Sequence, residues 1–115
     1  MSQDPMDERL TMLRRVGGDK LIHELIELLM ENAPRKLAAA RAALEQGDID
    51  QVGRAAHALA SSAGNLGARE MQQAAYALEH GAGASGDLPD LLRQLEACWP
   101  PARDLLAERK RGLKP

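Results

Sequence analysis

The sequence predicts an all-α fold, and three observations support that prediction. β-Strands favour aromatic and β-branched side chains, yet this 115-residue chain has no Phe, one Trp and one Tyr. Leu, Ala, Glu, Arg and Gln, which are good helix formers, dominate it. Apolar residues recur with the spacing of helices that bury one face. The β-branched residues are only Thr11, Val16, Ile22, Ile26, Ile49 and Val52.

The "GGD" stretch at residues 17–19 separates the first two expected elements. Glycine disfavours a helix interior, so we expect a short helix before this stretch and a long one after it. Asp19 is expected to cap the long helix, because its carboxylate can accept hydrogen bonds from free backbone N–H groups. Pro34 interrupts the apolar stripe of residues 21–44, which resumes in register beyond it. One kinked helix and two short helices are both consistent with that pattern.

The next expected helix lies between Asp48 and Gly67. Gly47 ends the preceding helix, and Gln51 follows the capping Asp48 by three residues. The apolar stripe between these limits predicts an amphipathic helix. Its members are Ile49, Val52, Ala56, Leu59, Ala63 and Leu66.

Two further helices follow along the chain. One contains the apolar residues of 71–78, and the "GAGASGD" stretch at residues 81–87 then predicts a loop. The last apolar stripe, residues 88–106, stays in register through Pro100 and Pro101, so one kinked helix and a true break are both open. Amphipathic segments joined by short loops predict an antiparallel four-helix bundle with a short additional N-terminal helix.

Length, charge and composition narrow the class of protein. Apolar residues make up 44% of the chain, which is typical of a globular protein. We expect a single domain over residues 1–115, with its core at residues 8–108. The 15 basic and 17 acidic residues give a net charge of −2, so neither nucleic acid nor an anionic membrane is expected as a partner.

The chain shows neither a membrane span nor a secretory signal. No apolar run approaches the ~18 residues that cross a bilayer, and the first residues are polar and acidic. Cys98, the single cysteine, falls in an apolar stripe and is expected in the core. A lone cysteine is consistent with a reducing compartment. We therefore expect a cytoplasmic protein, and its polar outer faces favour a monomer.

His57 is the candidate functional residue because of its neighbours. On a helical wheel it lies about 120° from the centre of the apolar stripe, toward solvent. On its face lie Gly53, Ala60, Ser61 and Gly64. Glycine inside a helix costs about 0.5–1 kcal/mol against alanine, so stability does not explain this set. We interpret the set as an open docking surface from which the imidazole projects.

An imidazole with an open approach is suited to nucleophilic attack on a group carried by a partner. If that group is phosphoryl, the partner must supply the metal ion and most of the charge stabilisation. The alternative is a solvated surface histidine in an Ala-rich chain. A metal site is not expected, because no Cys, His, Asp or Glu lies three or four residues from His57. A Ser–His hydrolase is not expected either, because no acidic residue at helical spacing would orient the ring beside Ser61.

The stretch "AAHALASSAGNLGA", residues 55–68, resembles the signature of histidine phosphotransfer (HPt) domains, His-x-Leu-Lys-Gly-Ser-Ser-x-x-Leu-Gly-Ala. The matching positions are His57, Leu59, Ser62, Leu66, Gly67 and Ala68. The resemblance covers most of residues 8–108. It implies a four-helix bundle in which His57 is the phosphoacceptor.

The same resemblance implies the activity and the partners. His57 would relay a phosphoryl group between the aspartates of response-regulator receiver domains, in a multistep phosphorelay with a hybrid sensor histidine kinase. The chain would be a phosphocarrier without autonomous kinase activity, and it contains no nucleotide-binding loop. It would bind no cofactor itself, while Mg²⁺ is expected in the receiver domain.

Two positions depart from the signature. Ala60 stands where the family has a lysine thought to neutralise the phosphate, and Ser61 stands where it has glycine. Loss of the lysine removes a charge-assisted contact to the phosphoryl oxygens. Arg54, three residues before His57, and Ser61 are therefore the candidate phosphate-supporting residues. If no cation replaces the lysine, the phosphohistidine is less favoured. Ala60 therefore motivates an alternative function, a non-phosphorylated docking module that binds a receiver domain or a kinase.

The two other histidines and the two aromatic residues are also considered as candidate functional residues. His23 and His80 lack a surround of small residues and are expected on the surface. His80 falls in the last turn of its helix, where a partial positive charge is favoured. Tyr76 and Trp99 are the only aromatic residues, and both are expected to serve packing.

Overall fold

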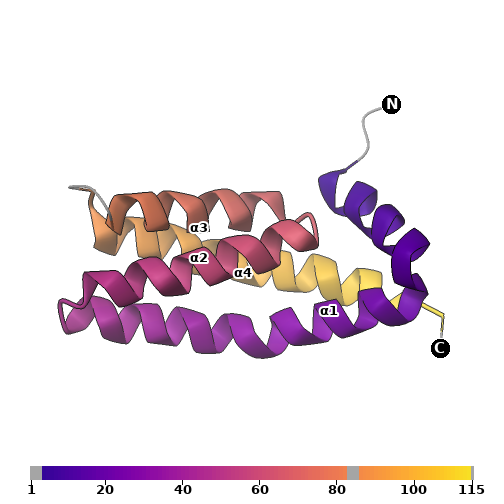
Figure 1. Cartoon of the computed structure of the whole chain (residues 1–115), viewed down its shortest axis with the longest axis horizontal. Helices are drawn as coiled ribbons and strands as arrows, with labels where there is room; N and C mark the ends of the chain where they lie inside the picture. Colours follow the sequence, from indigo (N-terminus) through magenta and orange to yellow (C-terminus); the bar gives the residue numbers. More distant parts are fainter. Residues whose placement is uncertain (1–3, 83–85, 115) are drawn as a thin grey trace.

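The computed structural model describes residues 4–82 and 86–114, which form four helices (Figure 1). These are α1 (Pro5–Glu45), α2 (Ile49–Asn65), α3 (Arg69–Ala82) and α4 (Leu88–Arg111). Helix α2 packs between α1 and α3, and α4 packs against both α1 and α3. The predicted all-α fold and antiparallel four-helix bundle are confirmed.

The chain bends sharply at Gly18, where the backbone inside α1 has φ 71° and ψ −172°. A positive φ is costly for residues with a Cβ and cheap for glycine. Residues 5–17, here called the N-terminal arm, form the additional helix and lie at an angle to the bundle (Figure 1). The carboxylate of Asp19, expected to cap the next segment, is instead bound by the Arg14 guanidinium at 2.7 Å and the Lys114 N–H at 2.9 Å.

Buried apolar side chains and two polar contacts hold the N-terminal arm against the bundle. Met6 and Leu10 belong to the buried core. The Nε atom of Arg9 donates to the carbonyl oxygen of Asn65 at 3.2 Å, and Arg109 of α4 donates to Asp7 at 2.8 Å. The arm therefore contacts α2 at its last residue and α4 near its C-terminal end.

The prolines do not break their helices. Helix α1 continues through Pro34, and α4 continues through Pro100 and Pro101. All three are exposed, and on the solvent side of a helix water can replace the backbone N–H partner that proline removes. Of the alternatives that the sequence left open, the continuous helices are correct.

The turns on either side of α2 follow the sequence prediction. Gly47 and Gly67 have positive φ values of 73° and 72°. The Asp48 side chain accepts a hydrogen bond from the Gln51 N–H at 3.2 Å, as a helix cap does. The loop predicted at 81–87 begins later than expected, because α3 extends to residue 82. Residues 83–85 of that loop lie outside the described part of the chain.

The core is apolar throughout the described residues, and none of its buried members is polar or charged. Many of them are alanines, which allow the helices to approach closely. Trp99 is buried as predicted, whereas Cys98 is only half-buried, and burial raises the pKa of its thiol. Within residues 4–82 and 86–114, no helix combines the length and hydropathy that crossing a bilayer needs. The largest fully buried side chains are Ile22, Ile26, Val52, Leu59, Leu66, Met71, Leu78, Leu92, Leu95 and Leu106.

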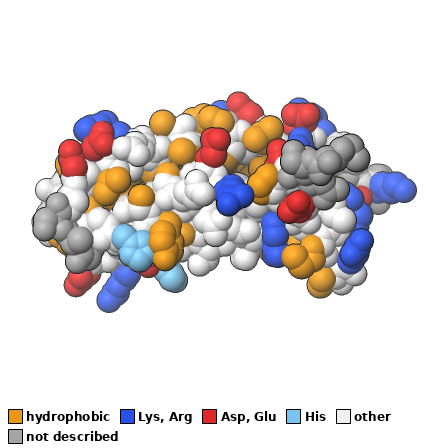
Figure 2. Space-filling model, turned by 90° about the horizontal axis from the view of Figure 1, so that it is seen from above, with side chains coloured by type: hydrophobic (Ala, Val, Ile, Leu, Met, Phe, Trp, Pro, Cys, Tyr) orange, Lys and Arg blue, Asp and Glu red, His pale blue; other side chains and the backbone are white. Residues whose placement is uncertain are grey.

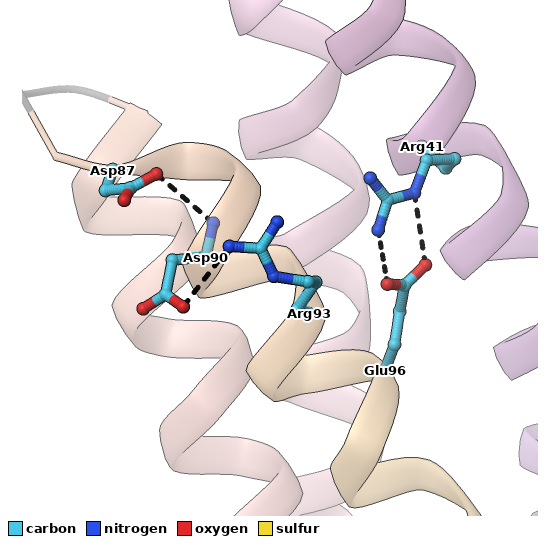
Figure 3. Close-up of polar contacts among 5 residues, drawn as sticks. All are labelled: Arg41, Asp87, Asp90, Arg93 and Glu96. Atoms are coloured by element: carbon cyan, nitrogen blue, oxygen red, sulfur yellow. Dashed lines mark hydrogen bonds and ion pairs between the residues drawn. The ribbon is translucent and has the colours of Figure 1, made fainter.

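Figure 3 shows two groups of polar contacts, one between α1 and α4 and one at the start of α4. Arg41 of α1 makes a two-point pair with Glu96 of α4, in which Nε lies 3.3 Å from Oε2 and Nη2 contacts Oε1. The Glu96 carboxylate raises the pKa of the Arg41 guanidinium. At the start of α4, Asp87 accepts a hydrogen bond from the Asp90 N–H at 3.2 Å, and Arg93 pairs with Asp90.

Candidate functional site

His57 lies in the middle of α2, and its side chain is 67% exposed. Its ring reaches across to α3, where Nδ1 lies 2.7 Å from Oε2 of Glu79. An ionised carboxylate can only accept hydrogen bonds, so Nδ1 carries the proton and donates it to Glu79. In the neutral imidazole the free lone pair is therefore on Nε2. The contact thus sets both the orientation of the ring and the nitrogen that is available for chemistry.

Sequence reasoning missed Glu79. The residue is 22 positions from His57, and helical spacing relates only residues of one helix. The signal that locates Glu79 is the antiparallel packing of α2 on α3. The same register that pairs His57 with Glu79 also places Gly64 against Gln72.

The small residues around the candidate histidine lie at the seam between α2 and α3. A Cβ added to Gly53 would touch the Cβ of Ala82 at 3.5 Å, and one added to Gly64 would collide with the Gln72 amide. Ala60 is only 7% exposed. The expectation that Ala60 belongs to an exposed docking surface is therefore wrong, because α3 packs against it. Close packing of two helices accounts for small residues along this line.

Ser61 and Arg54 lie on the exposed side of α2. Arg54 shares an open hollow with His57 and with Glu79. Across residues 4–82 and 86–114, Arg54 takes part in no ion pair. Among the described residues no carboxylate pairs with its guanidinium, which lines the same hollow as the imidazole. The hollow is lined by Ile49, Asp50, Gly53, Arg54, His57, Glu79 and Ala82.

A protein-family model for the Hpt domain matches residues 24–107 of this chain. The chain belongs to the Hpt domain family. Among solved structures it is similar to histidine-containing phosphotransfer protein B (HptB) from Pseudomonas aeruginosa PAO1, with a TM-score of 0.84 at 24% sequence identity. That match covers 94% of this chain and 95% of the other, and it concerns the fold. A search of curated proteins gives no match.

This Hpt domain is a phosphocarrier that serves histidine phosphotransfer in a phosphorelay, and receiver domains and kinases of two-component systems are its partners. The matched range includes all of α2 and α3, and therefore the pair formed by His57 and Glu79. The N-terminal arm lies outside that range.

The remaining histidines and the tyrosine of this Hpt domain are exposed. His23 and His80 lie on the surface, as predicted, and Figure 2 shows histidine side chains at the surface in the left half of the view. Tyr76 was expected in packing, but it is 56% exposed, because α3 turns it outward. Its ring contacts the ring of His80, with centroids 4.0 Å apart and planes tilted by 59°. In the part of the chain that the structure describes, no three His, Cys, Asp or Glu residues gather as a metal site.

Proposed function

We propose that His57 is the phosphoacceptor of this Hpt domain. It accepts a phosphoryl group on Nε2 from the aspartyl phosphate of one receiver domain and returns it to the aspartate of another. The observation that carries the proposal is the 2.7 Å contact between His57 Nδ1 and Glu79. That contact leaves Nε2 as the unprotonated, nucleophilic nitrogen of an exposed ring.

The transfer step follows from this arrangement. The Nε2 lone pair forms the N–P bond while the P–O bond to the receiver aspartate breaks, and that aspartate leaves as a carboxylate. The ring becomes positively charged and keeps its Nδ1 proton, so the Glu79 carboxylate stabilises the charge through a charge-assisted hydrogen bond. In the second step the carboxylate of the next receiver attacks phosphorus, and neutral imidazole leaves. On this proposal the chain itself binds no cofactor, and Mg²⁺ held by the receiver domain would supply the charge that neutralises the phosphoryl oxygens.

Arg54 and Ser61 support the phosphoryl group in place of the family lysine. Arg54 shares the hollow with His57, and a guanidinium presents several donors to phosphoryl oxygens. Ser61 follows His57 by one helical turn on the exposed face. The test is the lifetime of the phosphohistidine: it shortens in Arg54→Gln and is retained in Arg54→Lys. Equal lifetimes in all three proteins would show that Arg54 plays no part.

The docking surface of this proposal includes Gly53, Ser61 and Gly64. The two glycines are partly exposed at the rim of the α2–α3 seam, so a partner can come close to the backbone beside the imidazole. The protein works as a cytoplasmic monomer without kinase activity of its own. Replacing Gly64 with Arg or Gly53 with Glu should slow transfer by obstructing the partner.

The deciding experiment is a phosphotransfer assay with phosphorylated receiver domains from the same cell. Wild-type protein should acquire acid-labile, base-stable phosphate, while His57→Gln should acquire none and keep its helical circular dichroism spectrum. Phosphate retained on the His57→Gln protein would contradict the assignment of the phosphoacceptor.

A second function is favoured by one observation, which is Ala60 in place of the family lysine. On that alternative the protein binds a receiver domain or a kinase through the same face but carries no phosphate. Binding of a receiver domain by wild-type protein, with no transfer from any phosphorylated receiver, would select this docking role over the first.

A further inference from the structure

The contacts between α2 and α3 show which positions of the two helices lie level with each other. His57 contacts Glu79, and a Cβ added to Gly64 would meet the side chain of Gln72. Seven positions separate His57 from Gly64 along α2, and seven separate Glu79 from Gln72 in the opposite direction along α3. Each step forward along α2 is therefore matched by one step back along α3.

Tyr76 is the exposed side chain of α3 at the level of Ala60. Counted from the pair of His57 and Glu79, position 60 lies level with position 76, three residues away on each helix. Ala60 is buried and has no polar side-chain atom, whereas Tyr76 is exposed. One turn from the imidazole, the rim of the seam therefore carries a phenol from α3 opposite a position of α2 that offers no side-chain donor.

His80 holds the phenol ring of Tyr76 on the side of α2. The two ring centroids are 4.0 Å apart, and Figure 2, in which tyrosine counts as hydrophobic, shows histidine and hydrophobic side chains next to each other on the surface. At about 100° per residue, Tyr76 lies about 40° and His80 about 80° round α3 from Gln72, which faces the seam. His80 therefore lies on the flank of the phenol that is turned away from α2, and its contact opposes a swing of the ring away from His57.

The side of the imidazole that faces α3 lacks another described donor for a phosphoryl group. Such a group carries roughly −1.5 to −2 charges and three acceptor oxygens. Glu79 can only accept hydrogen bonds when ionised, and the candidate donors Arg54 and Ser61 both belong to α2. Residues three apart on a helix have Cβ atoms about 5–6 Å from each other, so Tyr76 lies directly beside Glu79, and its phenol O–H is a hydrogen-bond donor.

We propose that Tyr76 donates a hydrogen bond from its phenol O–H to a phosphoryl oxygen of phosphorylated His57, and that His80 positions the phenol ring for this contact. The inference rests on the proposed function, because it concerns the phosphorylated form of His57. Tyr76 touches the phosphoryl group itself, whereas His80 acts through Tyr76. A hydrogen bond made only in the phosphorylated form shifts the exchange with a receiver aspartate toward His57.

The test measures how the phosphoryl group is distributed between His57 and a receiver aspartate when exchange has reached equilibrium. Tyr76→Phe keeps the ring and removes only the hydroxyl, so the ratio of phosphorylated His57 to phosphorylated receiver should fall about three- to tenfold. Gln73→Ala is the matched control on α3. Gln73 is exposed and lies about 100° round the helix from Gln72, so the same ratio should equal that of wild type.

A double variant tests whether His80 acts through Tyr76. His80→Ala keeps the hydroxyl but frees the ring, and it should lower the same ratio by a smaller factor than Tyr76→Phe does. Once the hydroxyl is absent, the change at His80 should have no further effect, because two residues that act through one contact are not additive. An equal effect of His80→Ala with and without the hydroxyl would overturn the positioning role.

NMR of the tyrosine ring gives a readout that does not depend on transfer rates. Tyr76 is the only tyrosine of the chain, so its ring carbon signals are assigned without ambiguity. The signal of Cζ, the carbon that bears the hydroxyl, should move when His57 of the wild-type protein is phosphorylated. In His57→Gln mixed with the same phosphorylated receiver, it should stay in place.

The outcomes separate this inference from the proposed function. If wild type carries phosphate on His57 while Tyr76→Phe gives the same distribution and the Cζ signal does not move, the role of Tyr76 is overturned and the proposed function stands. If wild type acquires no phosphate, both are overturned. If Tyr76→Phe weakens receiver binding and leaves the distribution unchanged, the hydroxyl bonds to the partner instead and the inference is wrong.

Discussion

Glu79 of α3 holds Nδ1 of His57 on α2 at 2.7 Å, across the seam between the two helices. One carboxylate thereby fixes the tautomer of an otherwise exposed imidazole. Because Glu79 is itself only 29% exposed, its hydrogen bond competes less with water than one fully in solvent would. Glu79 of the neighbouring helix therefore determines that Nε2 is the nitrogen with the free lone pair.

Replacing Glu79 tests this relationship. Glu79→Ala should slow phosphoryl transfer to His57 about 10- to 100-fold, which is the loss seen when a metal-binding histidine loses the partner that orients its ring. Glu79→Gln should lose much less, because its amide oxygen still accepts the Nδ1 proton. Nitrogen NMR of His57 supplies a second readout, since Glu79→Ala should mix the two tautomers of the neutral ring. A full transfer rate and one tautomer in Glu79→Ala would contradict the orienting role.

The seam also predicts the effect of restoring the family lysine. Ala60 is 7% exposed against α3, so Ala60→Lys forces a long side chain into a packed seam and should lower the free energy of unfolding by about 1–3 kcal/mol. Ser61→Lys is the matched control: Ser61 is exposed, and the change should stay within about 0.5 kcal/mol. Urea denaturation of both variants measures the difference. Equal free energies of unfolding for the two variants would mean that α3 moves to accommodate a lysine at position 60 without loss of stability.

The sequence predicts features of the fold that are local. The positive φ values of Gly47 and Gly67, and the cap formed by Asp48, each depend on a few consecutive residues. Apolar periodicity likewise identifies the four helices, since one helix face is a local property. The continuity of α4 through Pro100 was not decided by the sequence, because it depends on which side of the helix faces solvent.

In the candidate site too, local features could be predicted from the sequence, and contacts between helices could not. The exposure of His57 follows from its position on a helical wheel, and its motif is contained within one helix and the following turn. Its partner Glu79 lies on another helix and follows only from the register of α2 on α3. The same limit explains the error at Ala60. The helical wheel of α2 alone places Ala60 on the exposed face, whereas it is buried once α3 packs on α2.

Acid should release the C-terminal end from the bend at Gly18. The backbone N–H of Lys114 and the guanidinium of Arg14 both donate to Asp19, and they lower the pKa of that carboxyl below 3.8. A lowered folded-state pKa means that the contact stabilises the fold above the ordinary pKa and is lost as the pH falls through the folded value. The chemical shift of the Lys114 amide, followed by NMR below pH 4, should titrate with Asp19. In Asp19→Asn this titration should be absent; a titration that persists would assign it to another group.

Gly67 should be intolerant of any side chain, for two separable reasons. Its φ is +72°, and an added Cβ would lie 2.5 Å from the carbonyl oxygen of Pro5 and 2.7 Å from Cα of Met6. Gly47 shares the first property, with φ +73°, but an added Cβ there meets nothing within 4 Å. Gly47→Ala should therefore cost about 1–2 kcal/mol for the left-handed backbone alone, and Gly67→Ala should cost more, because the N-terminal arm must also move.

Hydrogen exchange separates the two effects. Gly67→Ala should speed amide exchange in the N-terminal arm, while Gly47→Ala should leave the arm as protected as in wild type. Equal losses of stability in the two variants, with an equally protected arm, would show that the arm adjusts to a side chain at Gly67 without leaving the bundle.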